Sequence, residues 1–273
     1  MQRHPFDLLM ELPEEHIRLD CAALHLARDE YPALDVTGYR AQLDALAEEV
    51  AAERPGLAST LRYRALHHVL VERHGFRGNE RDYYDPENSY LNRVLDRRVG
   101  IPISLAVVWI EVGRRLKWPV AGVNFPGHFL VRIDDPDRFV LVDAFGDGRS
   151  LSLADCRRLF AGDETEPSAG CASHFEPVDT RTLLSRMLNN LRVIYATHQD
   201  WPRLERVLAR LVAVQPRNSR HWQELAALHF RRGDADRAAA LLHICRQLAA
   251  GDSETATIAR SVACLRAAVN ALN

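Results

Sequence analysis

The chain has 273 residues, of which 47% are hydrophobic and 26% are charged, and its formal net charge is -2. These values are typical of a globular protein with enough chain for one large domain or two smaller ones. The near balance of charge argues against nucleic acid or an anionic membrane surface as a main partner. No apolar run is long enough to span a bilayer and no secretory signal is visible, so we expect a cytoplasmic protein.

Cysteine and histidine usage gives no sign of a bound metal ion or cofactor. The chain has five cysteines, an odd number, with no Cys-x-x-Cys pair and no other metal-ligand spacing, so we expect reduced thiols that mostly pack in the core. His67, His68 and His74 lie on a half-polar helical stretch without an acidic ligand at a matching interval. We therefore predict neither a metal site nor a cofactor.

The first part of the chain is predicted to be helical. Proline and acidic residues at 13–15 are typical of a helix start, and apolar residues at helical spacing predict further helices over 37–52 and 59–73. The next segment, 75–89, mixes Gly, Asn and Asp with large aromatics. That composition indicates a structured loop rather than a linker, because linkers lack aromatic anchors.

Helices are then followed by strands. A short apolar helix comes first, and we expect Gly100 to close it in the position after its C-cap. Pro102 suits the first turn of a longer helix. Three strand patterns follow at 120–125, 129–133 and 139–142, the last two joined by a short turn. Helices followed by antiparallel strands predict the α+β class.

From Leu183 the pattern is helical to the end and repeats. Aligning Ser185 with Ser219 gives a period of 219 − 185 = 34 residues, which is the period of tetratricopeptide repeats. A generic helical bundle is the alternative. The repeat hypothesis predicts a capping helix over Thr255 to Leu272 and a buried set in the second unit, namely Trp222, Leu225, Ala238 and Leu242. We therefore divide the chain into domains 1–178 and 179–273.

One group of residues resembles the catalytic groups of an enzyme. Cysteine hydrolases and acyltransferases combine a thiolate at a helix N-terminus, a histidine base on a facing strand, and an acid that orients the histidine. His128 precedes the second strand pattern and Asp143 ends the third. Adjacent strands bring such positions side by side, so we expect these two side chains to be hydrogen-bonded.

Three runs of residues resemble a known family. Asn88-Ser89-Tyr90-Leu91, Gly100-Ile101-Pro102-Ile103-Ser104-Leu105 and Pro126-Gly127-His128-Phe129-Leu130-Val131 resemble the bacterial SirB-type family. In that family a transglutaminase-like domain precedes tetratricopeptide repeats. The resemblance covers the chain from about Phe76 and implies a transglutaminase- or cysteine-protease-like fold, but it implies no particular reaction.

The chain departs from catalytic transglutaminases at the nucleophile. The family pattern places the cysteine where this chain has Pro102, which offers neither a thiol nor an N–H. Ser104 is the nearest substitute, but a shift of two residues turns it by about 200° around the helix. A serine there equally satisfies backbone donors at the helix start. Cys156 and Cys171 follow the hairpin and could approach the site in space.

Two functions stay open from the sequence. The favoured one is a non-catalytic binding or regulatory module that contacts a protein or peptide through the repeat region. Its retained cleft would use Asn88, Gly127 and Tyr84 for binding. The alternative is a hydrolase or acyltransferase in which His128 and Asp143 act with Ser104 or with an activated water.

Overall fold

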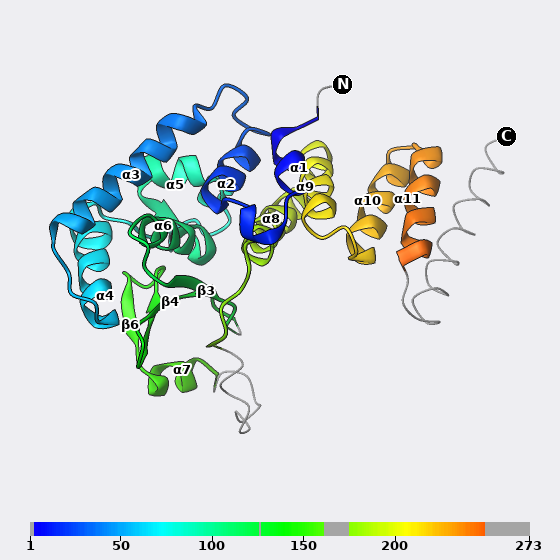
Figure 1. Cartoon of the computed structure of the whole chain (residues 1–273). Helices are drawn as coiled ribbons and strands as arrows, with labels where there is room; N and C mark the ends of the chain where they lie inside the picture. The colour runs from blue at the N-terminus through cyan, green and yellow to red at the C-terminus, as the bar shows by residue number, and fades with distance from the viewer. Residues whose placement is uncertain (1–2, 126, 161–174, 249–273) are drawn as a thin grey trace. The chain divides into compact units, whose positions relative to one another are not determined.

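The computed structural model describes residues 3–125, 127–160 and 175–248. Contacts divide the chain into two compact units (Figure 1). One is formed by Leu12–Met187, and the other combines Met1–Glu11 with Leu188–Asn273.

This division differs from the predicted domains 1–178 and 179–273. Helix α8 (Thr180–Thr197) begins just after the predicted boundary and runs without a break past Met187, where the first unit ends, so the units separate inside a helix. In addition, helix α1 (Pro5–Leu9) packs on α9 (Trp201–Val214), which places the N-terminal residues in the C-terminal unit. Local sequence patterns do not predict this contact, because the two helices are far apart in the chain.

The helices of the first unit largely follow the apolar periodicity of the sequence. The described ones before the sheet are η1 (Glu14–His16), α2 (Leu19–Ala27), α3 (Val36–Ala52), α4 (Ser59–His67), the π-helix η2 (His68–Arg73), η3 (Pro86–Ser89), α5 (Leu91–Arg97) and α6 (Pro102–Arg115). The first predicted helix is the exception. It is a 3-10 turn, then the extended residue Ile17, which is 5% exposed, and then α2.

Helix α6 is the central element of the first unit. Every residue from Ile103 to Gly113 is buried, so the helix is enclosed on all sides rather than amphipathic. Helices α3 and α5 contact it, as do strands of the sheet. Pro102 occupies its first position, as predicted.

The main sheet is antiparallel and has the order β3-β4-β5-β6. The strands are β3 (Val120–Val123), β4 (Leu130–Asp134), β5 (Phe139–Asp143) and β6 (Arg149–Leu151). The hairpin between β4 and β5 is confirmed, with Val131 opposite Val142. The short, mostly exposed β6 was not predicted, since Arg149-Ser150-Leu151 lacks a strand-like apolar pattern. Helices plus this small sheet confirm the α+β class for this unit.

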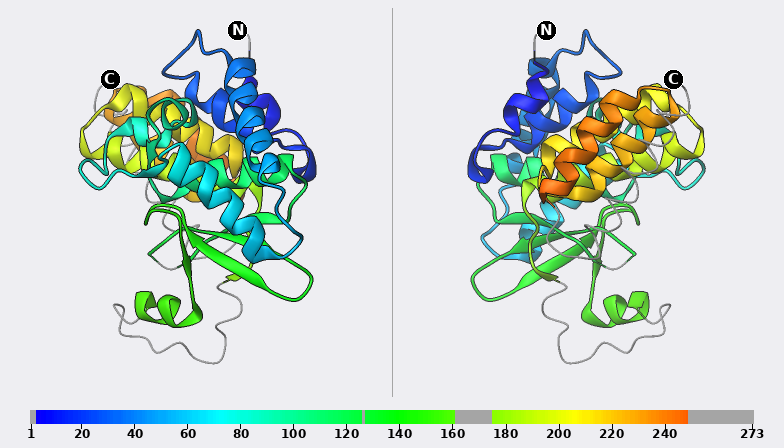
Figure 2. Two further views of the ribbon diagram at one scale, coloured as in Figure 1. Left: turned by 90° about the vertical axis from the view of Figure 1, so that its left-hand side faces the viewer. Right: turned by 90° about the vertical axis from the view of Figure 1, so that its right-hand side faces the viewer.

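The two faces of the sheet pack against different helices (Figure 2). Val120 approaches Gly113 so closely that a Cβ at Gly113 would lie 2.4 Å from it, so the face with Val120 lies against α6. The other face carries Leu130 and Leu141, which form a cluster with Cys156 of α7 (Leu153–Phe160).

Gly100 has a different role from the predicted one. Helix α5 ends at Arg98, which itself adopts the left-handed conformation with φ 60°. Gly100 instead pairs with Gly78 in the two-residue strands β1 (Arg77–Gly78) and β2 (Val99–Gly100). A Cβ at Gly100 would lie 2.7 Å from Ser104 Oγ. The glycine is therefore needed for close approach, not for helix termination.

The second unit contains α9, α10 (Ser219–Arg231), α11 (Ala235–Leu248) and the last part of α8. Helices α10 and α11 form a closely packed pair joined at Gly233, whose φ is 81°. Leu225, Ala238 and Leu242 are buried as predicted, whereas Trp222 is only partly buried and bonds through Nε1 to Pro216 O at 2.8 Å. The tetratricopeptide assignment stays a prediction, and the predicted capping helix lies outside the described residues.

No helix in the described part of the chain combines the length and the apolar character needed to cross a bilayer.

Candidate functional site

Ser104, in the first turn of α6, bonds the backbone at the N-terminus of this helix. Ser104 is fully buried, and its Oγ accepts a bond from Ile101 N at 3.1 Å. The hydroxyl proton is directed to a backbone carbonyl, either Asn88 O at 2.6 Å or Ile101 O at 3.1 Å. Ser104 therefore satisfies the backbone at the helix start, and it presents no hydroxyl to a substrate.

The side chain of Asn88 stabilises the loop that precedes α5 through hydrogen bonds. Its side chain is fully buried and donates to Asp82 O at 2.7 Å and Tyr83 O at 3.3 Å, while its Oδ1 accepts from Asn79 Nδ2 at 3.0 Å. Both amide hydrogens are thus used inside the protein. This geometry supports the turn role of Asn88 over the ligand-binding role that the sequence also allowed.

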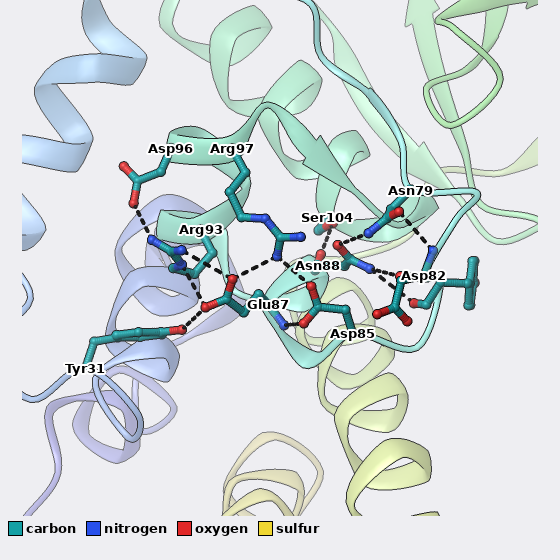
Figure 3. A network of polar contacts seen from close by, with 11 residues as sticks. Tyr31, Asn79, Asp82, Asp85, Glu87, Asn88, Arg93, Asp96, Arg97 and Ser104 are labelled. Atoms are coloured by element: carbon teal, nitrogen blue, oxygen red, sulfur yellow. Dashed lines mark hydrogen bonds and ion pairs between the residues drawn. The ribbon is translucent and has the colours of Figure 1, made fainter.

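A charged network centred on Glu87 holds the same segment (Figure 3). Arg93 donates to both carboxylate oxygens of Glu87 at 3.1 and 3.2 Å, and Arg97 donates to it at 2.9 Å. Arg97 also pairs with Asp85 at 2.7 Å. Burial and the Glu87 carboxylate raise the pKa of Tyr31 to about 12, so its hydroxyl stays protonated and bonds Glu87 at 3.3 Å.

Aromatic side chains line the outside of this loop. Tyr84 is 63% exposed and meets the ring of Tyr83 edge to face at 5.3 Å. Tyr83 meets Phe145 in the same way at 5.8 Å, which ties the loop to the turn after β5. Tyr84 is thus available for contact with another molecule, as the binding prediction requires.

Gly127 and His128 form the turn between β3 and β4. Gly127 is exposed with φ 70°, a conformation that favours glycine. His128 is half-buried, and its backbone N–H bonds Phe125 O at 3.0 Å. Its ring forms no hydrogen bond with the residues that the structure describes, so the expected bond to Asp143 is not formed.

Asp143 serves the turn that follows β5. Its Oδ1 accepts from Phe145 N at 3.1 Å and Gly146 N at 3.0 Å, and its Oδ2 lies 3.6 Å from Arg149. Residues that alternate along a strand share a face, so Asp143 lies on the Leu141 face, opposite to the face against α6.

One of the two remaining nucleophile candidates lies among the described residues. Cys156 is buried at 1% exposure in the cluster beneath the sheet, and Cys171 lies outside the described residues. Within the described ranges, no group of three or more histidine, cysteine or acidic side chains is arranged to hold a metal ion.

A cavity of about 560 Å³ exists in the same unit, but it lies at the other end of α6. Its lining includes Glu111, Arg114 and Arg115, whereas Ser104 lies in the first turn of the helix. Seven residues of helix separate Ser104 from Glu111, a rise of about 10 Å. The cavity is therefore separate from the candidate site.

The network around Glu87 was missed by sequence analysis. A signal was present, because Arg93 and Arg97 are four residues apart and so share one face of a helix. Glu87 stands just before that helix, where an acid is also favoured by the helix dipole. The partner Tyr31 carried no local signal, since it lies 56 positions from Glu87.

Comparison with known proteins identifies the family. Residues 37–189 match the model of the transglutaminase-like superfamily. A UPF0162 protein of Xylella fastidiosa is 40% identical over 76% of this chain and 75% of its own length. The chain belongs to the transglutaminase-like superfamily and, within it, to the UPF0162 proteins.

Two further relatives show the spread of this superfamily. A UPF0162 protein of Pseudomonas aeruginosa is 34% identical over 68% of the chain and 67% of its own length. F-box only protein 21 of Mus musculus is 32% identical over 64% of the chain, but the match covers 27% of that protein. No solved structure matches the chain significantly. The similarity to F-box only protein 21 is therefore limited to a part of that protein.

Proposed function

We propose that this UPF0162 protein is a non-catalytic transglutaminase-like protein that acts as a protein- or peptide-binding or regulatory module. In this proposal Pro102 replaces the nucleophilic cysteine of catalytic relatives. The C-terminal helices act as a tetratricopeptide-like region, as the SirB-type resemblance implies, and take up the partner.

The observation that carries the proposal is the buried hydroxyl of Ser104. A histidine base needs a proton-bearing nucleophile within about 2.6–3.2 Å. Ser104 Oγ instead bonds Ile101 N and a backbone carbonyl. Asp143 bonds the turn amides of Phe145 and Gly146 rather than an imidazole. Two of the three groups that a triad would link, Ser104 and Asp143, are thus used to hold local structure.

A direct assay tests the absence of acyl transfer. Purified full chain is incubated with monodansylcadaverine as amine donor and dimethylated casein as glutamine substrate. We expect incorporation no greater than in the protein-free blank. Losing the nucleophile of a triad removes about six orders of magnitude in rate, so a surviving reaction would be far below that of an active transglutaminase.

His128→Ala separates a true reaction from background. Incorporation by the wild type that disappears in His128→Ala, with an unchanged circular dichroism spectrum, would refute the non-catalytic proposal. It would favour the alternative acyltransferase, in which His128 acts as the base and the amine donor takes the acyl group while ammonia leaves. The half-buried ring of His128, without a bonded partner among the described residues, leaves that alternative open to test.

A further inference from the structure

A groove in the second unit has a defined chemical character. It is lined by side chains of α8, α9 and α10 and has a volume of about 280 Å³. Its floor is aliphatic, with Leu204, Leu208 and Leu228 exposed to 7%, 1% and 4%. Small-molecule sites usually measure about 300–1,000 Å³, so this groove suits one or two side chains better than a whole cofactor.

One end of the groove carries a neutralised charge pair. Arg192 Nη1 lies 3.0 Å from Glu224 Oε2, and Arg192 Nε donates to Asn189 Oδ1 at 3.1 Å. The charge of Glu224 is thus balanced within the groove wall. This end offers hydrogen-bonding groups rather than a net charge.

The other end of the groove carries the positively charged side chain of Arg231. The guanidinium of Arg231 lies 5.4 Å from the centre of the Trp201 ring. No carboxylate among the described residues pairs with Arg231. The ring covers one face of the guanidinium, while its N–H donors lie in the plane of the group and are suited to a bidentate carboxylate.

We infer that this groove binds a short peptide segment of a partner protein, with an aliphatic side chain on the leucine floor and a Glu or Asp carboxylate on Arg231. This inference rests on the proposed function and specifies the class of its partner. Glu224 and Arg231 are seven residues apart on α10, a rise of about 10 Å. An extended chain advances about 3.3 Å per residue, so roughly three residues span the groove.

A spacing series tests the inference on the full chain. The probes are fluorescein-labelled peptides with one leucine and one glutamate separated by zero to four Ala or Ser residues. We expect one spacing to bind in an anisotropy titration, and replacement of its glutamate by glutamine to weaken binding about tenfold or more. Absence of binding at every spacing, or equal binding of the glutamine peptide, overturns the inference.

Variants locate the contact. Arg231→Gln should remove the preference for the glutamate peptide over the glutamine peptide. Arg237→Gln is the control and should keep this preference, because Arg237 is an exposed residue of α11 that does not line the groove. Ala227→Glu places an acid on the exposed groove wall and should abolish binding with the fold intact by circular dichroism. Unchanged binding in Ala227→Glu or Arg231→Gln refutes the site.

The two proposals can fail separately. Amine incorporation that depends on His128 refutes the non-catalytic function even if the peptide binds. A blank incorporation assay together with charge-independent peptide binding overturns the inference about the groove and leaves the non-catalytic function standing.

Discussion

Asp20 is 1% exposed, and three arginines surround its carboxylate. Its Oδ2 lies 2.6 Å from Arg115, 3.0 Å from Arg40 and 3.6 Å from Arg18. Burial acts to raise the pKa of Asp20, but the bonds from Arg115 and Arg40 outweigh it, so the pKa lies below its usual value of 3.8. The buried ion pairs therefore link α2, α3 and the end of α6.

Replacing Asp20 by Asn should destabilise the protein by about 3–5 kcal/mol, because it leaves two arginines without their buried partner. Asp44→Asn is the matched control. Asp44 also pairs with Arg115, at 2.6 Å, but its side chain is 59% exposed, so its loss should cost less than about 1 kcal/mol. Urea unfolding at neutral pH measures both, and equal costs would contradict the argument.

The lowered pKa of Asp20 predicts that its contribution to the stability of the protein depends on pH. Because the folded pKa of Asp20 is lowered, its stabilisation is fully present above about pH 3.8 and is lost as the pH falls through the folded pKa. The free energy difference between the wild type and Asp20→Asn should therefore shrink as unfolding is measured at increasingly acid pH. A difference that stays constant down to pH 2 would count against this assignment.

At the scale of elements, the hairpin between β4 and β5 provides the N-terminal cap of helix α4. Helix α4 has Ala58 as its N-cap, which provides no side-chain bond. Asp135 in the hairpin accepts from Ser59 N at 2.8 Å, and from Asp137 N and Arg138 N at 3.0 and 2.9 Å. The bond from Ser59 is the leading cause of a pKa of Asp135 held well below 3.8.

Removing this cap should loosen the start of α4. Asp135→Ala is expected to lower the thermal midpoint and to speed hydrogen exchange in the first turn of α4. The difference from wild type should be present at neutral pH and disappear as the pH falls through the lowered pKa. Asp137→Ala is the control in the same turn, since its side chain forms no described bond. Identical hydrogen exchange of the first turn of α4 in the two variants would contradict the capping role of Asp135.

The loop before α5 depends on Glu87. Glu87→Gln leaves Arg93 and Arg97 with weaker partners, so we expect a loss of about 1–2 kcal/mol, limited by a carboxylate that is 38% exposed. Glu80→Gln, in the same loop but exposed and without a described partner, should be neutral. Chemical unfolding of both variants provides the measurement, and a similar result for the two would contradict a structural role for the network.

At the scale of the whole molecule, the N-terminal helix belongs to the C-terminal unit. Phe6 is fully buried, and Asp7 lies 2.7 Å from Arg210 of α9. Phe6→Ala should destabilise the unit that contains α9 to α11 by about 3–5 kcal/mol. Leu8→Ala, at a position that is 46% exposed, is the control.

Hydrogen exchange resolved by segment measures this effect. Amides of α9 should lose protection in Phe6→Ala, whereas those of α6 in the other unit should keep it. Loss of protection that is spread evenly over the chain would mean that the two units do not respond separately.

Sequence analysis alone predicts the order of helices and strands, the hairpin at 134–137 and the start of α6 at Pro102. These features rest on local periodicity and turn chemistry, which neighbouring residues set. The α+β class follows from that order. The resemblance in the motif runs added the transglutaminase-like family, which the match over residues 37–189 confirms.

The bonding partners of the site residues, in contrast, depend on how distant segments pack. The Ser104 hydroxyl bonds a carbonyl 16 positions away, and Asp135 caps a helix 76 positions away. Asp143 bonds the nearby turn instead of His128 because the amides of Phe145 and Gly146 lie within reach. Residue types at suitable spacing indicate which groups can meet, but packing of distant segments decides which partner each polar group takes.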